Sequence, residues 1–319
     1  MDLSIVIVNW NTRDLVAGCL DSVFAYPASQ LFDVWVVDNA STDGSPDLLR
    51  SKYPQVHLIV NARNEGFAAA SNLGIARSAG RYILLLNSDA QVGPGALAAM
   101  IDFMEAHPFA GALGPQLVNP DGSFQASYAP FPSLFSELML VTTLARFLLG
   151  PHAPSPGPRH GETARPVDWV AGAALLVRRS MVQAIGPLDS GYFMYSEDTD
   201  WCWRMWRAGW SVWYVPDVQV IHHAGASSRQ QPARNYGALY RSKIRFFARH
   251  YGTLATETLR AVLIAAAVLR LGLWHAAGRL ARSSTARTRL RLRIEQERAL
   301  LRACQRRPLG STAGADAAL

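Results

Sequence analysis

The sequence predicts an α/β protein with a Rossmann-like nucleotide-binding half, a mostly parallel central sheet and a helical C-terminal extension. Short apolar runs alternate with helical patterns through the first half of the chain, as in parallel strands joined by crossover helices. After about Gly225 no strand pattern recurs and arginine becomes frequent. We therefore expect a nucleotide-binding domain over 1–225 and a helical, arginine-rich extension over 226–319 that associates with a membrane or with another subunit.

The elements of the first half follow from their apolar runs. The continuous β-branched run at 4–8 is typical of a strand buried on both faces. Similar runs predict strands at 34–37, 57–60 and 82–86. Helical periodicity predicts helices at 12–24 and at 66–79, the second closed by Gly80.

The second half is less regular but still patterned. Strands are expected at 169–177 and 211–215, and a helix at 197–208 that Gly209 ends. The proline-rich stretch 151–158 predicts a mobile loop beside the site.

Cysteine content and the N-terminal sequence indicate a reducing compartment. Cys19, Cys202 and Cys304 are odd in number, far apart and without a CxxC pair, which disfavours a disulfide framework or a zinc site. Met1–Ser4 leads straight into a strand pattern without the basic region of a signal peptide. We expect a cytoplasmic protein.

Positive charge is concentrated in the C-terminal segment. The chain carries a net +7, whereas 279–307 alone holds ten arginines and two glutamates, a net +8, so the remainder sums to −1. Such a tail attracts anionic lipid or nucleic acid, although a solvated extension is equally compatible.

A helical wheel of the segment before this tail is amphipathic. Apolar residues fall on one side and basic residues on the other: Leu259, Val262, Leu269, Leu273 and Leu280 against Arg260, Arg270, His275, Arg279 and Arg282. Because Arg270 interrupts the best apolar window, the pattern favours a helix lying in a membrane interface over one that spans it. A helix packed on the main domain or on a partner is the alternative.

Acidic residues stand where two predicted strands end, which is where open α/β sheets bind ligands. Asp38 follows the second strand and could accept hydrogen bonds from a ribose or a base, or could make an Asx turn. Asp89 follows the fourth strand and could hold Mg²⁺ or Mn²⁺ beside a diphosphate, or could be a turn residue.

A second acidic group, Glu197-Asp198-Thr199-Asp200, opens the helix at 197–208. Acids in a first helical turn commonly complement the helix dipole. A partly desolvated carboxylate there could also act as a general base. His222 and His223 follow a further strand-like stretch and could supply a metal ligand or phosphate donor, or could be structural.

Five motifs occur in an order that resembles the family 2 glycosyltransferases. They are SIVIVNWN (4–11), DNASTDGS (38–45), NEGFAAASNLGI (64–75), LLNSD (85–89) and YSEDTDWCWR (195–204). The sequence is most similar to the rhamnosyltransferase-like branch of cell-envelope polysaccharide synthesis, over about residues 3–251. The resemblance implies a GT-A fold, a nucleotide-diphosphate sugar donor, a divalent cation (Mg²⁺ or Mn²⁺) and inversion at the anomeric carbon.

The resemblance also implies roles for individual residues. Asp198 would be the general base, with Glu197 beside it, and Asp89 a metal ligand, with His222 contacting metal or diphosphate. The nucleotide pocket would include Asn9, Asp38, Asn39, Asn64, Gly66 and Asn72. The sequence departs from the family at Asn87, where many relatives have Asp, and at Ser88, where the branch often has Pro.

The function expected is transfer of a sugar, with rhamnose as one candidate, to a hydroxyl of a glycan or lipid-linked acceptor. The expected location is the cytoplasmic face of the cell membrane, on an anionic surface. The sequence is compatible with a homo-oligomer, and we expect no nucleic acid to be bound. The alternatives are an inactive scaffold with this fold, a nucleotidyltransferase and a nucleic-acid-binding protein. A nucleotidyltransferase would have a glycine-rich basic loop after the first strand, and residues 9–12 are not such a loop. A nucleic-acid-binding protein would spread its basic residues over a folded surface.

Overall fold

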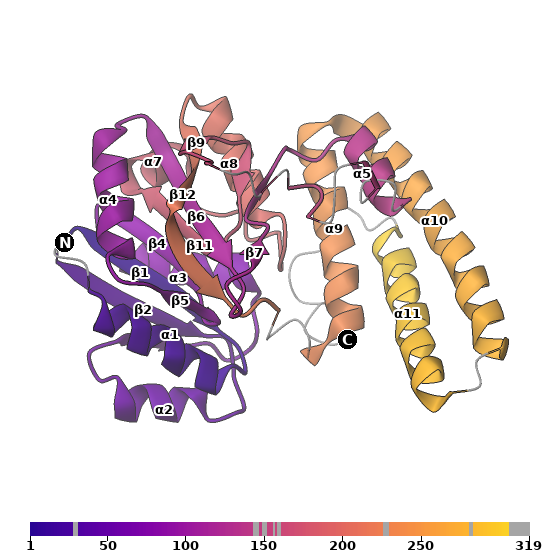
Figure 1. The fold of residues 1–319 in the computed structure, drawn as a ribbon, viewed down its shortest axis with the longest axis horizontal. Coiled ribbons are helices and arrows are strands. Elements are labelled where there is room, and N and C mark those ends of the chain that lie inside the picture. The colour runs from indigo at the N-terminus through magenta and orange to yellow at the C-terminus, as the bar shows by residue number, and fades with distance from the viewer. Residues whose placement is uncertain are drawn as a thin grey trace.

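The computed structural model describes residues 1–27, 31–142, 147–148, 152–155, 157, 161–225, 230–280 and 283–305. A large mixed sheet with helices on both faces forms one part of the molecule, and a group of long helices forms the other (Figure 1). The main path of the sheet runs β3–β2–β1–β4–β11–β6–β12–β5. These strands are β1 (Leu3–Asn9), β2 (Phe32–Asp38), β3 (His57–Val60), β4 (Tyr82–Asn87), β5 (Ala90–Val92), β6 (Ala110–Val118), β11 (Ala174–Arg178) and β12 (Ser211–His222).

The first half of the sheet is parallel, as predicted. β1 pairs in parallel with β2 and β4, and β2 with β3, so the carboxyl ends of these strands meet at one edge. The crossovers contain α1 (Arg13–Ala25), α2 (Ser45–Lys52) and α3 (Phe67–Arg77). α3 ends before Gly80, so the predicted cap was wrong: the Gly80 amide donates to Ser4 Oγ, and a Cβ there would collide with the β1 backbone.

The predicted strand at 169–177 is two strands in two sheets. β10 (Trp169–Val170) pairs with β8 (Tyr128–Ala129) in a small antiparallel sheet, whereas β11 lies between β4 and β6 in the large one. The chain changes sheet at Gly172, whose amide donates to Asp198. β12 joins the predicted strand at 211–215 to the following strand-like stretch, with an irregularity between Val215 and Gln219.

The remaining elements of this part complete the sheet and its covering layers. β7 (Phe124–Gln125) pairs with β6, and β9 (Arg165–Pro166) with β12. The helices here are α4 (Ala96–Ala106), α7 (Arg179–Ile185) and α8 (Glu197–Arg207). α8 starts where predicted, and Gly209 after it has φ +84°, as expected of a C-terminal glycine. The three cysteines are buried and free.

The C-terminal part is helical, as predicted. It consists of α9 (Pro232–His250), α10 (Gly252–Leu280) and α11 (Ser284–Ala303). Their shared apolar core includes Phe246, Phe247, Leu259, Leu263 and Leu300. α5 (Leu134–Val141), from the middle of the chain, packs on α10 through Val141 (Figure 1). The division at residue 225 stays a prediction.

α10 turns an apolar stripe outward and Arg260 and Arg270 inward, whereas Arg279 at its end is exposed. Leu269 and Leu273 are 66% and 56% exposed, whereas Arg270 binds the buried Glu297 at 2.9 Å and Arg260 donates to the Cys304 carbonyl. The sequence placed Arg260 and Arg270 on the basic side of the wheel, and in the structure both are turned inward because they find acceptors on α11 or directly after it. Within the described ranges, α10 is the single helix long and apolar enough to cross a membrane.

Candidate active site

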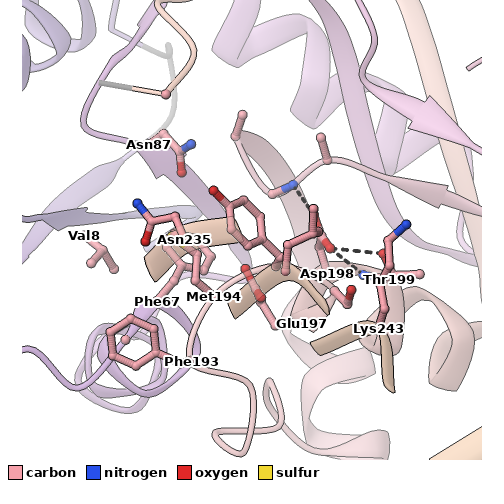
Figure 2. A pocket seen from close by; sticks show the side chains of 18 of the residues that line it. Val8, Phe67, Asn87, Phe193, Met194, Glu197, Asp198, Thr199, Asn235 and Lys243 are labelled. Carbon is pink, nitrogen blue, oxygen red and sulfur yellow. Dashed lines mark hydrogen bonds between the residues drawn. The ribbon is translucent and has the colours of Figure 1, made fainter. Parts of the chain in front are cut away.

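A cavity of about 620 Å³ lies between the carboxyl edge of the parallel strands, the start of α8 and one face of α9. Figure 2 shows Val8 and Asn87 on one side and Glu197, Asp198 and Lys243 on another. Most of the predicted site residues line this cavity: Asn39, Asn64, Gly66, Asp89, Glu197, Asp198 and His222. Pro154 also lines it, so the proline-rich loop reaches the site. The predicted mobility of 151–158 is untested, and 151, 156 and 158 lie outside the described residues.

Asp38 and Asn9 lie beneath the cavity rather than in its wall. The Asp38 carboxylate is fully buried and accepts hydrogen bonds from Asn9 Nδ2 and the Ser41 amide, both at 2.8 Å. Asn9 Oδ1 in turn accepts from Thr12 Oγ1 at 2.7 Å. Asp38 does not cap the next helix, whose N-cap is Gly44; the hydrogen bonds that it accepts from the Ser41 amide and from Asn9 fix the loop that carries Asn39.

Asn39 ties the end of β2 to the loop before α3. Its Nδ2 donates to Asn64 Oδ1 and to the Gly66 carbonyl, and its Oδ1 accepts from the Glu65 amide. Gly66 has φ +85° and lies so close to Phe193 that a Cβ would collide with it. Only glycine satisfies both conditions. Asn72 does not line the cavity, because its side chain donates to the Leu188 carbonyl and accepts from the Leu188 amide.

Asp89 and His222 form an acid–imidazole pair at the end of β4. His222 Nε2 lies 3.1 Å from Asp89 Oδ1 and 3.3 Å from Asn87 Nδ2. The other ring nitrogen, Nδ1, is 2.6 Å from Gln125 Oε1, and the Gln125 amide nitrogen donates elsewhere, to Asn119 and the His222 carbonyl. The network therefore places a proton on Nδ1, and Nε2 faces the carboxylate.

This pair fits a divalent cation. A metal-binding histidine usually donates its other N–H to a fixed acceptor, which here is Gln125. In the described part of the chain, no cluster of three or more His, Cys, Asp or Glu side chains could hold a metal. Asp89 and His222 would therefore supply two ligands and leave positions for phosphate oxygens and water, which is usual for Mg²⁺.

The start of α8 presents two buried acids to the cavity. Asp198 accepts hydrogen bonds from the amides of Gly172 at 2.9 Å and Thr199 at 2.7 Å. Burial raises the pKa of Asp198, against the effect of these hydrogen bonds. Glu197 is 5% exposed and its Oε2 has no hydrogen-bond partner. Burial, and next the nearby Asp198 charge, raise the pKa of Glu197 well above its usual range.

The turn before α8 holds two non-glycine residues in the left-handed region. Tyr195 has φ +70° and Ser196 φ +63°, a conformation that costs of order 1 kcal/mol or more per residue. Both residues line the cavity. Their conformation directs the first turn of α8, with Glu197 and Asp198, at the cavity.

Asp200, the third acid, points away from the cavity and anchors α8. Its fully buried carboxylate binds Arg204 at 2.9 Å, His250 at 2.8 Å and Arg249 at 3.3 Å. Burial alone would raise its pKa, but hydrogen bonds from His250 and Arg204 hold the pKa below its usual value.

We expect Asp200→Asn to lower the free energy of unfolding by about 3–5 kcal/mol, because it removes the fully buried carboxylate that Arg204, Arg249 and His250 share. Since the folded-state pKa is lowered, the stabilisation is present above about pH 4 and is lost as the pH falls through the folded value. Urea denaturation between pH 3 and pH 7 measures this. The control is Asp47→Asn, which breaks the exposed pair with Arg50. It should lower the free energy of unfolding by less than about 1 kcal/mol. Equal losses in the two variants would contradict the anchoring role.

Sequence reasoning missed the contribution of α9. One face of this helix lines the cavity with Gln231, Arg234, Asn235, Leu239 and Lys243. Counted from Gln231, the other four follow after three, four, eight and twelve residues, and this helical spacing is the signal that could have identified the face. Gln125, which orients His222, lies in a short strand with no comparable pattern.

Acids at the strand ends and on a facing helix, around one cavity, define the class of protein. Two models of glycosyltransferases match the chain: glycosyl transferase family 2 over residues 4–156 and glycosyl transferase family group 2 over residues 82–286. The chain belongs to the family 2 glycosyltransferases and is a glycosyltransferase with the GT-A fold.

Individual relatives agree with this assignment. The chain is 36% identical to the N-acetylglucosaminyl-diphospho-decaprenol L-rhamnosyltransferase of Mycobacterium tuberculosis, over 81% of this chain and 86% of that protein. It is 40% identical to the rhamnosyltransferase WbbL of Escherichia coli, over 26% of this chain and 31% of that one.

Solved structures support the fold. The mannosyltransferase PcManGT of Pyrobaculum calidifontis, in complex with GDP-Man and Mn²⁺, has a TM-score of 0.51 at 18% identity, over 94% of this chain and 85% of that one. GalNAc-T7 with UDP, GalNAc and Mn²⁺ has a TM-score of 0.54 at 20% identity. The match covers 69% of this chain and only 43% of that protein.

Proposed function

We propose that this chain is an inverting glycosyltransferase that moves a sugar from a nucleotide-diphosphate donor to a hydroxyl of a lipid-linked glycan in cell-envelope polysaccharide synthesis. The observation that carries the proposal is that Asp89 and His222, from the sheet edge, share one cavity with Asp198, from α8. Rhamnose is the first sugar to test, because two of the relatives are named rhamnosyltransferases. The lipid-linked acceptor is suggested by the name of the mycobacterial relative.

Asp198 is the general base of the proposed reaction. Its carboxylate is fixed by the amides of Gly172 and Thr199, and burial makes it more basic than a free aspartate. It takes the proton of the acceptor hydroxyl, whose oxygen attacks the anomeric carbon from the face opposite the departing diphosphate. Burial raises the pKa of Glu197 well above its usual range, and in its protonated form this carboxyl can donate a hydrogen bond to a sugar oxygen.

Asn39, Asn64 and Gly66 hold the donor end of the cavity. Together with Asn9 and Asp38 beneath them, they form the proposed nucleotide-binding floor. Asp89 and His222 would hold Mg²⁺ or Mn²⁺, which would neutralise the charge developing on the diphosphate. Arg234, which lies over the Phe193 ring at 5.2 Å and lines the cavity, adds a fixed positive charge.

We place the enzyme on the cytoplasmic face of the membrane, with the outer side of α10 against lipid. The outward stripe of α10 is apolar, and the neighbouring helix α11 carries exposed arginines, among them Arg287, Arg289, Arg291 and Arg293. An apolar face flanked by basic side chains favours an anionic bilayer surface.

The proposal is tested with a panel of dTDP-, UDP- and GDP-sugars. We expect one donor, with dTDP-rhamnose first, to be turned over only with Mg²⁺ or Mn²⁺ and to be transferred to a polyprenyl-diphospho-N-acetylglucosamine acceptor with inversion. Product stereochemistry is read by NMR, and EDTA is the control. Retention of configuration, or full activity in EDTA, would overturn the corresponding part of the proposal.

A further inference from the structure

The short helix α5 carries three different faces on eight residues. Ser136, Glu137 and Leu140 line the cavity. Leu134, Phe135 and Leu138 point outward and are exposed, Phe135 by 71%. Val141 packs in the core of the long helices, and the Val141 carbonyl accepts a hydrogen bond from Arg270 of α10. α5 therefore separates the cavity from the outside of the molecule by the thickness of one helix. Its remaining side packs on α10.

The outer face of α5 and the outer stripe of α10 are both apolar. On α10, the exposed residues between 261 and 273 are alanines, a glycine, Ile264, Val268, Leu269 and Leu273. The arginines within this stretch of the helix and just before it are turned inward. A stretch of helix that turns Arg260 and Arg270 inward and presents isoleucine, valine and leucine side chains outward fits a hydrocarbon environment better than water. The basic side chains of α11, the neighbouring helix, complement the negative charge of an anionic bilayer. They do not complement the apolar surface that a second folded protein would bring to this stripe.

The cavity is longer than a single sugar residue, and one of its ends lies beside α5. α9 lines it from Gln231 to Lys243, which at 1.5 Å per residue is about 18 Å. Figure 2 shows Lys243 on the same side of the pocket as Asp198 and Thr199, away from Asn87 and Asn235. Next to Lys243, Ser242 Oγ donates to the Met194 carbonyl just before α8. The α5 end of the cavity is thus the end next to the proposed base, opposite the donor floor.

A single buried ion pair marks this end. Lys243 Nζ lies 2.7 and 2.8 Å from the two oxygens of Glu137, whose side chain is 3% exposed. Glu137 holds the ammonium in place, and an ammonium has three N–H donors. The donor that Glu137 does not use is available to an anionic group in the cavity. The apolar side chains around it, Pro132, Leu140 and Leu239, suit a chain of hydrocarbon.

We propose that α5 is the wall past which the lipid-linked acceptor enters: its lipid lies along the outer faces of α5 and α10, and its phosphate binds Lys243. This places the acceptor sugar beside Asp198. The inference rests on the proposed transferase function and adds where, and by which residues, the acceptor is bound.

The first test compares two acceptors that carry the same sugar. One is a long-chain polyprenyl-diphospho-N-acetylglucosamine in vesicles of phosphatidylglycerol and phosphatidylethanolamine, and the other is a short, water-soluble diphosphate analogue. We expect Phe135→Asp with Leu138→Asp to lower the ratio of long-chain to short-chain transfer at least tenfold. Phe109→Asp, on a side chain 79% exposed on the sheet part of the molecule, is the matched control and should leave the ratio at the parent value.

The outcomes separate the two proposals. If the parent protein glycosylates neither acceptor, the proposed function fails. If the parent uses both and the α5 variant keeps the parent ratio, the entry wall is wrong. If the α5 variant instead changes the oligomeric state in light scattering without vesicles, the apolar face binds a second copy of the chain and the lipid assignment is overturned.

The second test removes the ion pair as a whole, so that no buried charge is left unpaired. In Lys243→Met with Glu137→Gln, we expect the KM for the diphosphate acceptor to rise at least tenfold, with the donor KM within twofold of the parent. Thermal unfolding verifies that the variant folds. A matched rise in the KM for a phosphate-free glycoside acceptor would show a merely structural role and would overturn the phosphate assignment.

Discussion

Asp198→Asn is expected to lower kcat by roughly 10³-fold, within the range that general-base catalysis supplies. The amide keeps the shape of the side chain and the hydrogen bond from the Gly172 amide, but it cannot take the proton of the acceptor hydroxyl. Donor affinity should stay near the parent value, because the donor floor is built from other segments. Single-turnover transfer and isothermal titration of the nucleoside diphosphate measure the two quantities separately.

The pH dependence gives an independent check of this role. Because burial raises the pKa of Asp198, kcat should increase with pH until the carboxyl is ionised and then level off. The rising limb should disappear in Asp198→Asn. The exposed Asp217 offers a control, since Asp217→Asn should leave both rate and profile as in the parent. Turnover close to that of the parent in Asp198→Asn would remove Asp198 from the role of base.

Asp89→Asn should cost roughly 10²–10³-fold in kcat, comparable to removing one strong electrostatic contact from a leaving group. The structure gives the proposed cation only Asp89 and His222 from the protein in the described part of the chain, so the loss of the one carboxylate removes the main charge that holds it. We also expect the Mn²⁺ concentration for half-maximal activity to rise by at least tenfold.

Metal titration of activity, with Mn²⁺ binding followed by electron paramagnetic resonance in the presence of nucleoside diphosphate, tests this expectation. Asp121→Asn, at an exposed turn where the carboxylate accepts hydrogen bonds from the Ser123 amide and hydroxyl, is the control with the same charge change. An unchanged metal requirement in Asp89→Asn would mean that the cation is held elsewhere.

The strand ends were predictable because their signals are local. β3 occupies the predicted residues, and β1, β2 and β4 each extend the predicted run by one or two residues at one or both ends. Since parallel strands end at one edge, the carboxyl ends at Asp38 and Asp89 had to be neighbours. The start of α8 was equally local, and its acids follow it directly.

Two predictions failed for reasons that lie outside the local sequence. The run at 169–177 has the composition of one strand, but its two halves bind different partners, β8 and β4. The wheel of α10 puts Leu259 on the same side as Leu269 and Leu273, but the structure buries Leu259 and exposes the other two, so the wheel did not tell which side faces outward. Glu297 and the Cys304 carbonyl decide that, because they bind Arg270 and Arg260 from the inside.

The sequence by itself determined the class of fold, the order of the motifs and the acids of the site, because periodicity and strand-end chemistry act over a few residues. Only the tertiary structure decided that α5 and α9, from distant parts of the chain, close the cavity through the pair Glu137–Lys243. It also decided that Asp200 anchors α8 while Asp198 faces the cavity. Glu137 and Lys243 are 106 residues apart, and Asp200 and His250 are 50 residues apart. At such separations burial and charge pairing, rather than local propensity, select the partner.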